Sequence, residues 1–337
     1  MQEDRRNILI VKIGAIGDVA MALIMLRGFE KDNITWIVGQ KSAPLVEATQ
    51  KIAKIIKVDE DHLLKGSIFR KIYETLHCWR NIFFKRFDLV ITAHPDPRYR
   101  ILTLCCFKHK HSYFDKNRDL FPASNNFHGI EYLRLIGATF KELNYNKLNL
   151  LLPDGRRLNT CKKTIAIYPG GDSSKSQKGL RKWPIECFVQ VVCELEEKGF
   201  QVLLVGSLED SWVIPYFKNT AATSYIGKTS ILELIATLKS CTGIITHDGG
   251  PLHLARLAGC KICAIFGPTS PHDICDMNSN EIYIWGGDGL NCRPCYNGRT
   301  FKNCCRNICM MQVTPRQVVR EVFSKWQLNC NEDSSSS

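Results

Sequence analysis

The chain has 337 residues, well above the roughly 100–150 residues of a typical domain, and this length predicts two domains. Hydrophobic residues make up 45% and charged residues 23% of the chain, a composition that excludes wholesale disorder. The 45 lysines and arginines outnumber the 33 acidic residues, and the net charge of +12 favours an anionic partner such as nucleic acid, anionic lipid or a phosphorylated substrate. A merely soluble basic surface is the alternative.

No apolar run approaches the roughly 18–20 residues that span a bilayer. The apolar stretch that begins at Ile8 is interrupted by Lys12 and Asp18, so it does not indicate a signal peptide. We therefore expect a cytoplasmic protein.

The first half of the chain alternates short β-rich runs with helical stretches. Strands are predicted at residues 7–13, 34–38, 55–58 and 88–93, and helices at 19–29, 43–52 and 68–86. After a polar linker at 152–163, strands are predicted at 164–168, 201–205, 243–246 and 261–266, and helices at 184–198, 231–240, 252–257 and 315–326. This rhythm predicts two α/β domains with parallel sheets, at residues 1–152 and 153–330, followed by a disordered tail at 331–337. Ligands of such folds bind outside the carboxyl ends of the strands.

The first glycine-bearing joint runs Lys12-Ile-Gly-Ala-Ile-Gly-Asp18, between a predicted strand and a predicted helix. Backbone N–H groups at such a place favour an anion. The two glycines lie three residues apart, a spacing that matches neither the dinucleotide fingerprint nor a P-loop. Asp18 stands where a helix N-cap belongs, and the alternative is a general base at the tip of the first strand.

Two further joints follow predicted strands. Tyr168-Pro-Gly-Gly-Asp-Ser-Ser leads toward Arg181 and Lys182, whose positive charges suit a diphosphate. Thr246-His-Asp-Gly-Gly-Pro-Leu-His253 opens a helix, and its amides suit an anionic group. Each joint alone is compatible with a glycine turn and a solvated charge. Three of them at strand ends indicate a ligand site.

Taken in order, these segments resemble glycosyltransferase family 9, the lipopolysaccharide heptosyltransferases. ILIVKIGAIGDVAMALIMLRGF is similar to the opening strand, Gly-Asp pair and helix of that family. IAIYPGGDSSKSQKGLRKWPIECF is similar to its Lys-x-Trp-Pro block, and GIITHDGGPLHLARLAGCKICAIFGPTSP resembles its signature with Asp-Thr/Ser-Gly-Pro and Phe-Gly-Pro-Thr. CRPCYNGRTFKNCCRNICMMQVTPRQV is similar to its cysteine-rich ending. Residues 35–150, the acceptor side, carry the least resemblance.

The resemblance implies a GT-B fold, in which two Rossmann-like domains face each other across a cleft. It implies inverting, metal-independent transfer of heptose from ADP-L-glycero-β-D-manno-heptose to the lipopolysaccharide inner core, with no cofactor required. The enzyme would be peripheral, at the cytoplasmic face of the inner membrane. Asp18 would be the catalytic base, and Arg181 or Lys182 would neutralise the departing ADP. The donor would be bound by Gly170, Gly171, Ser173, Glu209 or Asp210, Asp248, Gly249, Gly250 and His253.

Two departures from the family pattern bear on the donor. The family lysine of Lys-x-Trp-Pro falls on Arg181, which grips phosphate at two oxygens where lysine is a point charge. The family threonine or serine falls on Gly249, so a hydroxyl is lost. A different nucleotide-sugar therefore stays an alternative donor.

Sixteen cysteines are many for an intracellular chain, and five of them crowd into the segment from 292 to 309. Cys292, Cys295, Cys304 and Cys309 could form a thiolate site for a structural zinc or iron ion. The alternative is a set of reduced structural thiols, because the spacing is irregular and no histidine flanks it.

The acceptor side is basic, with 24 lysines and arginines against 16 acidic residues in positions 1–150. Arg98 and Arg100 are candidate contacts for a lipid-linked phosphorylated saccharide, and the surplus favours an anionic inner-membrane surface as a further partner. The same fold acting on a protein acceptor is one alternative function. A basic nucleic-acid-binding protein and a metal-dependent interaction module are the others, but no aromatic-basic RNA signature supports nucleic acid, and no such partner is expected.

Overall fold

The computed structural model describes residues 5–114, 127–139, 143, 145–154, 163–171, 179–276, 281–296, 300–304 and 306–328. It divides into two compact units, one up to Leu151 and one from Leu152 onward, so the division falls one residue before the boundary expected from the sequence. The tail at 331–337, expected to be disordered, and the donor candidate Ser173 lie outside the described residues. No described helix combines the length and the apolar character needed to cross a bilayer.

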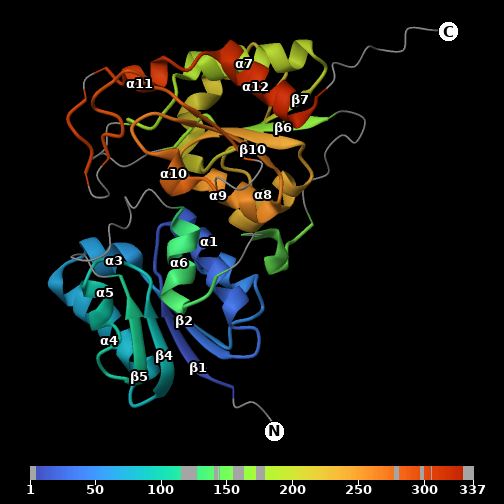
Figure 1. The fold of residues 1–337 in the computed structure, drawn as a ribbon. Helices are drawn as coiled ribbons and strands as arrows, with labels where there is room; N and C mark the ends of the chain where they lie inside the picture. Colours follow the sequence, from blue (N-terminus) through green and yellow to red (C-terminus); the bar gives the residue numbers. More distant parts are fainter. Residues whose placement is uncertain are drawn as a thin grey trace. The chain divides into compact units, whose positions relative to one another are not determined.

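The first unit is built on a parallel sheet in the order β3-β2-β1-β4-β5 (Figure 1). Its strands are β1 (Asn7–Val11), β2 (Asn33–Gly39), β3 (Lys54–Val58), β4 (Arg86–Thr92) and β5 (Phe107–Tyr113). The central strand β1 is buried from Ile8 to Val11, as expected for a strand with neighbours on both edges and helices on both faces. The fold places the end of β1 at the middle of the sheet.

The helices of the first unit differ in extent from the predicted ones. They are α1 (Ile16–Ala22), the 3₁₀ helix η1 (Leu23–Gly28), α2 (Ala43–Glu47), α3 (Glu60–Lys65), α4 (Ile68–Ile82), α5 (Arg98–Ile101), α6 (His128–Ile136) and the 3₁₀ helix η2 (Tyr145–Leu148). The predicted helix at 68–86 was too long, because Phe84 has φ of 52° and the chain then enters β4. The sequence also missed β5, whose polar run FKHKHSY belongs to an edge strand that is only partly covered.

The second unit carries a parallel sheet in the order β11-β10-β9-β6-β7-β8. Its strands are β6 (Thr164–Ile167), β7 (Gln201–Leu204), β8 (Thr223–Ser224), β9 (Gly243–His247), β10 (Lys261–Phe266) and β11 (Ile282–Trp285). Its helices are α7 (Ile185–Glu197), the 3₁₀ helix η3 (Leu208–Phe217), α8 (Ile231–Lys239), α9 (Gly250–Ala258), α10 (Pro271–Ile274), α11 (Ile308–Met311) and α12 (Pro315–Trp326). α12 and α7 pack on one core with Trp183 and Phe188 (Figure 1).

Both sheets have the same strand order when each is counted from its own first strand. The order reverses between β1 and β4 in the first unit and between β6 and β9 in the second. In open α/β sheets the crevice for a ligand lies outside the carboxyl ends of the strands at such a reversal. We therefore expect the ligand-binding residues in the segments after β1, β4, β6 and β9.

Candidate functional site

The segment after β1 holds an ion pair between Lys12 and Asp18. Asp18 lies in the first turn of α1, and its Oδ2 atom accepts a hydrogen bond of 3.0 Å from Lys12 Nζ. The Lys12 side chain is 1% exposed, whereas that of Asp18 is 43% exposed. Asp18 is not the N-cap of α1, because that position is occupied by Ala15. The Asp18 carboxylate is thus bound by a buried lysine and remains partly accessible to solvent.

The surroundings of Asp18 keep it ionised. Burial would raise the pKa of its carboxyl, but the charge of Lys12 and the hydrogen bond from Lys12 act in the opposite direction. The charges of His128 and His94 add to the effect, and the pKa lies below its usual value. An ionised, accessible carboxylate at a switch point can take a proton from a bound hydroxyl.

Several residues lie near Asp18 that the sequence did not connect with it. His94 follows β4, stacks on Tyr99 with ring centroids 4.1 Å apart, and accepts at Nδ1 from the backbone N–H of Asp96. Lys12 Nζ lies 5.7 Å from the ring centroid of Tyr132, on α6. Burial, followed by the charge of Asp18, raises the pKa of Tyr132. These residues come from three separate segments, so no local motif could reveal them.

Glu60, at the start of α3, is a second carboxylate on this edge of the sheet. A Cβ atom at Gly39 would collide with its carboxyl group, and one at Gly14 would lie 3.3 Å from it, so the two glycines make room for it. Burial raises the pKa of Glu60. Among the residues that the structure describes, its Oε1 atom has no hydrogen-bond partner.

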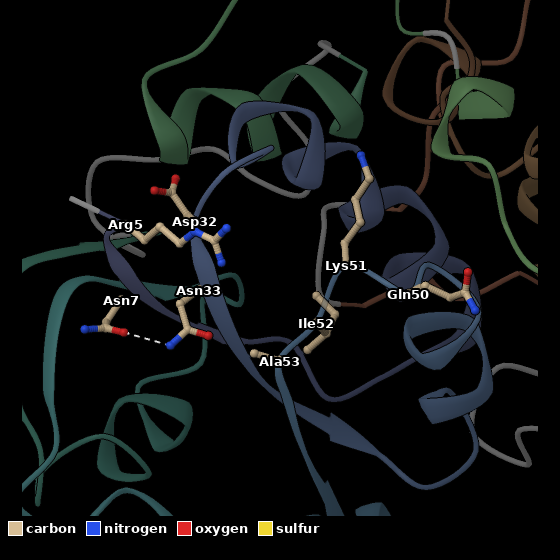
Figure 2. Close-up of a pocket in the computed structure, with 8 residues that line it drawn as sticks. All are labelled: Arg5, Asn7, Asp32, Asn33, Gln50, Lys51, Ile52 and Ala53. Carbon is tan, nitrogen blue, oxygen red and sulfur yellow. Dashed lines mark hydrogen bonds between the residues drawn. The ribbon is translucent and has the colours of Figure 1, made fainter. Parts of the chain in front are cut away.

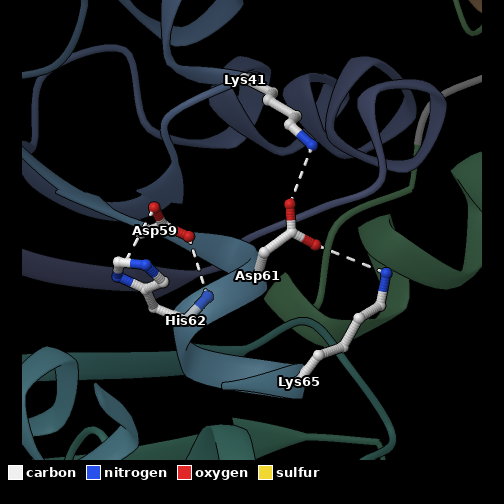
Figure 3. Close-up of polar contacts among 5 residues, drawn as sticks. All are labelled: Lys41, Asp59, Asp61, His62 and Lys65. Atoms are coloured by element: carbon white, nitrogen blue, oxygen red, sulfur yellow. Dashed lines mark hydrogen bonds and ion pairs between the residues drawn. The ribbon is translucent and has the colours of Figure 1, made fainter. Parts of the chain in front are cut away.

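The first turn of α3, which carries Glu60, is fixed by its neighbours. Asp59 accepts from the backbone N–H of His62 at 2.8 Å and caps the helix. Asp61 bridges Lys41 and Lys65 at 3.1 and 3.4 Å (Figure 3). These pairs are exposed, so they hold the turn in place more than they add stability.

The two acceptor candidates lie on α5, beyond β4. Arg98 is paired with Asp96, with Nη2 2.7 Å from Oδ2, so its charge is largely compensated. The Arg100 guanidinium lies 4.3 Å from the ring centroid of Tyr113, at the end of β5. Both cations are thus at the carboxyl edge of the same sheet as Asp18.

In the second unit, the loop after β6 is tied to the loop after β7 by Asp210. The Asp210 Oδ1 atom accepts from Gly171 N at 2.6 Å, and Oδ2 accepts from the backbone and side chain of Ser207. A Cβ atom at Gly170 would collide with the Asp210 carboxyl. Gly171 has φ of 98°, which favours glycine. Asp210 is therefore committed to the loops, whereas Glu209 beside it is exposed.

His247, at the end of β9, lies beneath this loop and was not among the predicted site residues. Burial lowers the pKa of His247 to about 3, against a hydrogen bond to the backbone of Gly170, so the ring is neutral. Its Nδ1 atom accepts from Trp183 N at 3.4 Å. The ring therefore connects the β6 loop with the Arg-Lys-Trp-Pro segment.

Asp248 lies directly after β9 and pairs with one of the two cations of the second joint. Its Oδ2 atom accepts from Thr269 Oγ1 at 2.9 Å and from Arg181 Nη1 at 3.4 Å. Its side chain is 5% exposed, whereas that of Arg181 is 29% exposed. The Lys182 ammonium instead lies 4.8 Å from the ring centroid of Trp212, on η3. The two adjacent cations therefore have different partners.

Helix α9 begins at Gly250, with Gly249 as its N-cap. Among the described residues, which omit 172–178, no atom lies within 4 Å of a Cβ atom at Gly250, so this part of the structure leaves space beside the helix N-terminus. Unpaired N–H groups at such an end attract an anion.

His253, one turn further along α9, is oriented by Arg256. Arg256 Nη1 lies 3.1 Å from His253 Nδ1, and Arg256 is itself paired with Glu281 at 2.6 Å. Arginine can only donate, so Nδ1 accepts and the neutral ring carries its hydrogen on Nε2.

The four cysteines proposed as metal ligands lie near one another. Burial, with a smaller contribution from the charges of Cys295, Cys304 and Cys292, raises the pKa of the Cys309 thiol to about 11, against a hydrogen bond with the backbone of Met310. The Cys304 Sγ atom accepts from Asn307 N at 3.3 Å. Within the described residues, which omit Cys305, no group of three or more His, Cys, Asp or Glu side chains is arranged to hold a metal ion.

A surface pocket lies at the opposite end of the first sheet. It is lined by Arg5, Asn7, Asp32, Asn33, Gln50, Lys51, Ile52 and Ala53 (Figure 2). β1 and β2 begin at Asn7 and Asn33, so the pocket is at the amino ends of the strands, away from Asp18. It plays no part in the candidate site.

Comparisons with known proteins show which family and which solved structures the chain is similar to. A family model for glycosyltransferase family 9 (heptosyltransferase) matches residues 139–304. A glycosyl transferase family 9 structure from Veillonella parvula has a TM-score of 0.74 at 18% identity, and the match covers 97% of this chain and 99% of that one. These matches confirm the resemblance to glycosyltransferase family 9, the family whose model covers residues 139–304. The fold of the chain is of the GT-B type, with one parallel sheet in each unit.

Two heptosyltransferases show the range of similarity. The E. coli heptosyltransferase WaaC, solved with ADP-2-deoxy-2-fluoro heptose, has a TM-score of 0.68 at 16% identity, covering 94% of this chain and 99% of that one. Lipooligosaccharide heptosyltransferase 2 of Campylobacter jejuni is 25% identical over 226 residues, 62% of this chain and 66% of that relative. The chain thus spans just under two thirds of that relative's length.

Proposed function

We propose that the chain is an inverting heptosyltransferase that moves heptose from ADP-L-glycero-β-D-manno-heptose to the lipopolysaccharide inner core without a catalytic metal. The observation that carries the proposal is the Lys12–Asp18 pair, an accessible carboxylate kept ionised at a switch point. The donor is supported by the family match and by WaaC, whose structure contains an ADP-heptose analogue.

In the proposed step the acceptor hydroxyl gives its proton to Asp18 while its oxygen forms a bond to the anomeric carbon. The bond from that carbon to the β-phosphate oxygen breaks, and ADP leaves with the electron pair. Attack from the side opposite ADP inverts the anomeric configuration. Arg181 and Lys182 stabilise the charge that develops on the diphosphate.

The other donor residues divide into contacts and supports. Gly250 and the N-terminus of α9 leave room for the diphosphate, and His253 offers Nε2–H to the donor. The exposed Glu209 is the better candidate for the ribose, because both oxygens of Asp210 are already used. Asp248 acts by holding Arg181. Arg98 and Arg100 are the proposed contacts for acceptor phosphates.

The proposal is tested by measuring ADP release from ADP-heptose with heptose-deficient lipopolysaccharide, with a polypeptide and with no acceptor. Lipopolysaccharide-dependent release is expected, and Asp18→Asn is expected to lower it about 10²–10⁴-fold because the base is lost. Asparagine can still accept from Lys12, so the melting temperature shows whether the variant is folded.

Full turnover by a folded Asp18→Asn variant would show that Asp18 is not the base. ADP release that depends on the polypeptide would show that the acceptor is a protein and not lipopolysaccharide. If the protein binds ADP but releases none from ADP-heptose, the fold assignment stands and the proposed acceptor or sugar is wrong. If it neither binds ADP nor releases it, the proposed donor is wrong.

The cysteine segment supports a separate proposal, a structural zinc or iron ion held by Cys292, Cys295, Cys304 and Cys309. Such an ion would have to draw the thiols closer than they lie, and it would convert them to thiolates. We expect about one equivalent of metal by elemental analysis and a lower melting temperature in Cys295→Ser. Metal-free protein of unchanged stability would contradict this proposal, which is independent of the transfer reaction.

A further inference from the structure

The outward side of α4 carries an apolar stripe. Five residues form this α4 stripe: Ile68, Phe69, Ile72, Tyr73 and Leu76. They recur at intervals of three and four residues, so they share one side of the helix. Each is between 48% and 80% exposed. Such a concentration of exposed apolar side chains marks an interaction surface.

The opposite side of α4 already supplies the contacts that hold the helix. Cys78 and Ile82 are fully buried in the core beneath the first sheet. Glu74, on the same inner side, accepts from the backbone N–H of Asp59 at 3.2 Å. The stripe is therefore not needed to attach α4 to its unit.

Apolar surface continues past the end of α4. Phe83 and Phe84 are exposed, and Phe84 stacks on Phe107 of β5 with ring centroids 5.7 Å apart. Trp79 Nε1 donates to the carbonyl oxygen of Ile101 at 3.0 Å, which joins α4 to the end of α5. The apolar surface thus extends from α4 to β5, an edge strand of the first sheet. The elements α4, α5 and β5 all belong to the first unit (Figure 1).

Basic side chains surround the α4 stripe. Arg70 and Arg80 are exposed on the same helix, and Lys85 and Arg86 are exposed just after it. The one acidic residue of α4, Glu74, is buried. The exposed charges of this helix are therefore positive, which complements an anionic partner.

We propose that the α4 stripe docks the protein onto an anionic lipid bilayer. Apolar side chains of an amphipathic helix enter the boundary between headgroups and acyl chains, while flanking cations pair with lipid phosphates. A second copy of the chain fits less well, because a two-fold interface brings the same patch of both copies together and opposes like charges. The purpose of the docking rests on the proposed function, because a membrane-anchored acceptor can be bound only at the membrane surface. The docking itself can be measured without donor or acceptor.

The test is co-sedimentation of the full chain with vesicles of phosphatidylglycerol and phosphatidylethanolamine, and with vesicles of phosphatidylcholine. We expect binding to the anionic vesicles, and an apparent Kd raised about tenfold or more in Phe69→Ser/Tyr73→Ser/Leu76→Ser. Arg70→Gln/Arg80→Gln is expected to weaken binding to anionic vesicles and to reduce its dependence on salt.

Matched controls come from the second unit. Tyr283→Ser/Met311→Ser removes exposed apolar side chains, and Arg316→Gln/Arg320→Gln removes two exposed cations of α12, and both should bind as the parent does. Transfer to a delipidated, soluble acceptor should be unchanged in the α4 variants, which separates a docking defect from a failed enzyme. Equal binding by parent and α4 variants overturns the proposal. So does a parent that ignores vesicles, whether it is a monomer or forms an oligomer that the α4 substitutions dissociate.

Discussion

Lys12 is the residue that gives Asp18 its chemistry. A lysine side chain that is 1% exposed is costly unless its charge is paired, and Asp18 supplies that pair at 3.0 Å. In return the lysine lowers the pKa of a carboxyl that burial would otherwise raise. The pair contributes its stabilisation fully above about pH 4, the usual carboxyl pKa, and loses it as the pH falls through the lowered pKa.

Replacing Lys12 by methionine is predicted to shift the acid limb of the pH–rate profile upward. With the cation gone, burial acts on Asp18 with less opposition, so its pKa rises and the base is protonated at a higher pH. The pH dependence of kcat/KM for ADP release measures the shift. Lys57→Met, which removes an exposed lysine paired with Glu47, is the control. An acid limb that stays in place would show that Lys12 does not tune the base.

Only part of the site could be predicted from the sequence. Asp18 and Asp248 follow predicted strands within glycine-bearing joints, and local pattern suffices to single them out. His247 and Glu60 could not be found this way. Their relevance depends on burial and on side chains that approach from distant segments, and neither property is visible along the chain.

At the scale of the element, α9 begins with a glycine that packing within the described residues does not require. The space around a Cβ atom at Gly250 is open, whereas a Cβ atom at Gly170 would collide with Asp210. Two glycines in neighbouring joints therefore have opposite roles. Under the proposed function, Gly250 leaves room for the diphosphate, whereas Gly170 lets two loops approach each other.

Gly250→Val is predicted to keep the fold and weaken donor binding. The new side chain enters open space at the N-terminus of α9, so we expect a melting temperature within a few degrees of the parent and a KM for the nucleotide-sugar raised about tenfold or more. Gly170→Ala is the contrast, because it should lower the melting temperature. An unchanged KM in Gly250→Val would place the diphosphate elsewhere.

The central strands of both sheets could be predicted, whereas of the edge strands in the described residues only β3 could. β1, β6 and β9 are largely apolar, and β4 ends in the apolar run at residues 89–91, which is the pattern of buried parallel strands. β5 and β8 lie at sheet edges, where little of the strand is buried, so their sequences lack that pattern. The short helix α3 was likewise missed, since its six residues include no buried side chain.

At the scale of the whole molecule, all the proposed donor residues belong to the second unit, and Asp18 belongs to the first. Binding of ADP alone is therefore predicted to protect backbone amides of the segments after β6 and β9 from hydrogen exchange. A ligand stabilises the structure that binds it. Exchange measured with and without ADP tests this, and protection centred on the segment after β1 would reverse the assignment.

The two units have the same strand order, but each has its own core. Substitutions that are distant and share no partners usually have additive effects on stability. Under the proposed division of roles, the first unit binds the acceptor and can accumulate substitutions. The second unit binds the nucleotide and keeps its binding residues. A new acceptor could then arise by drift in one half of the gene, with the chemistry of the leaving group inherited intact.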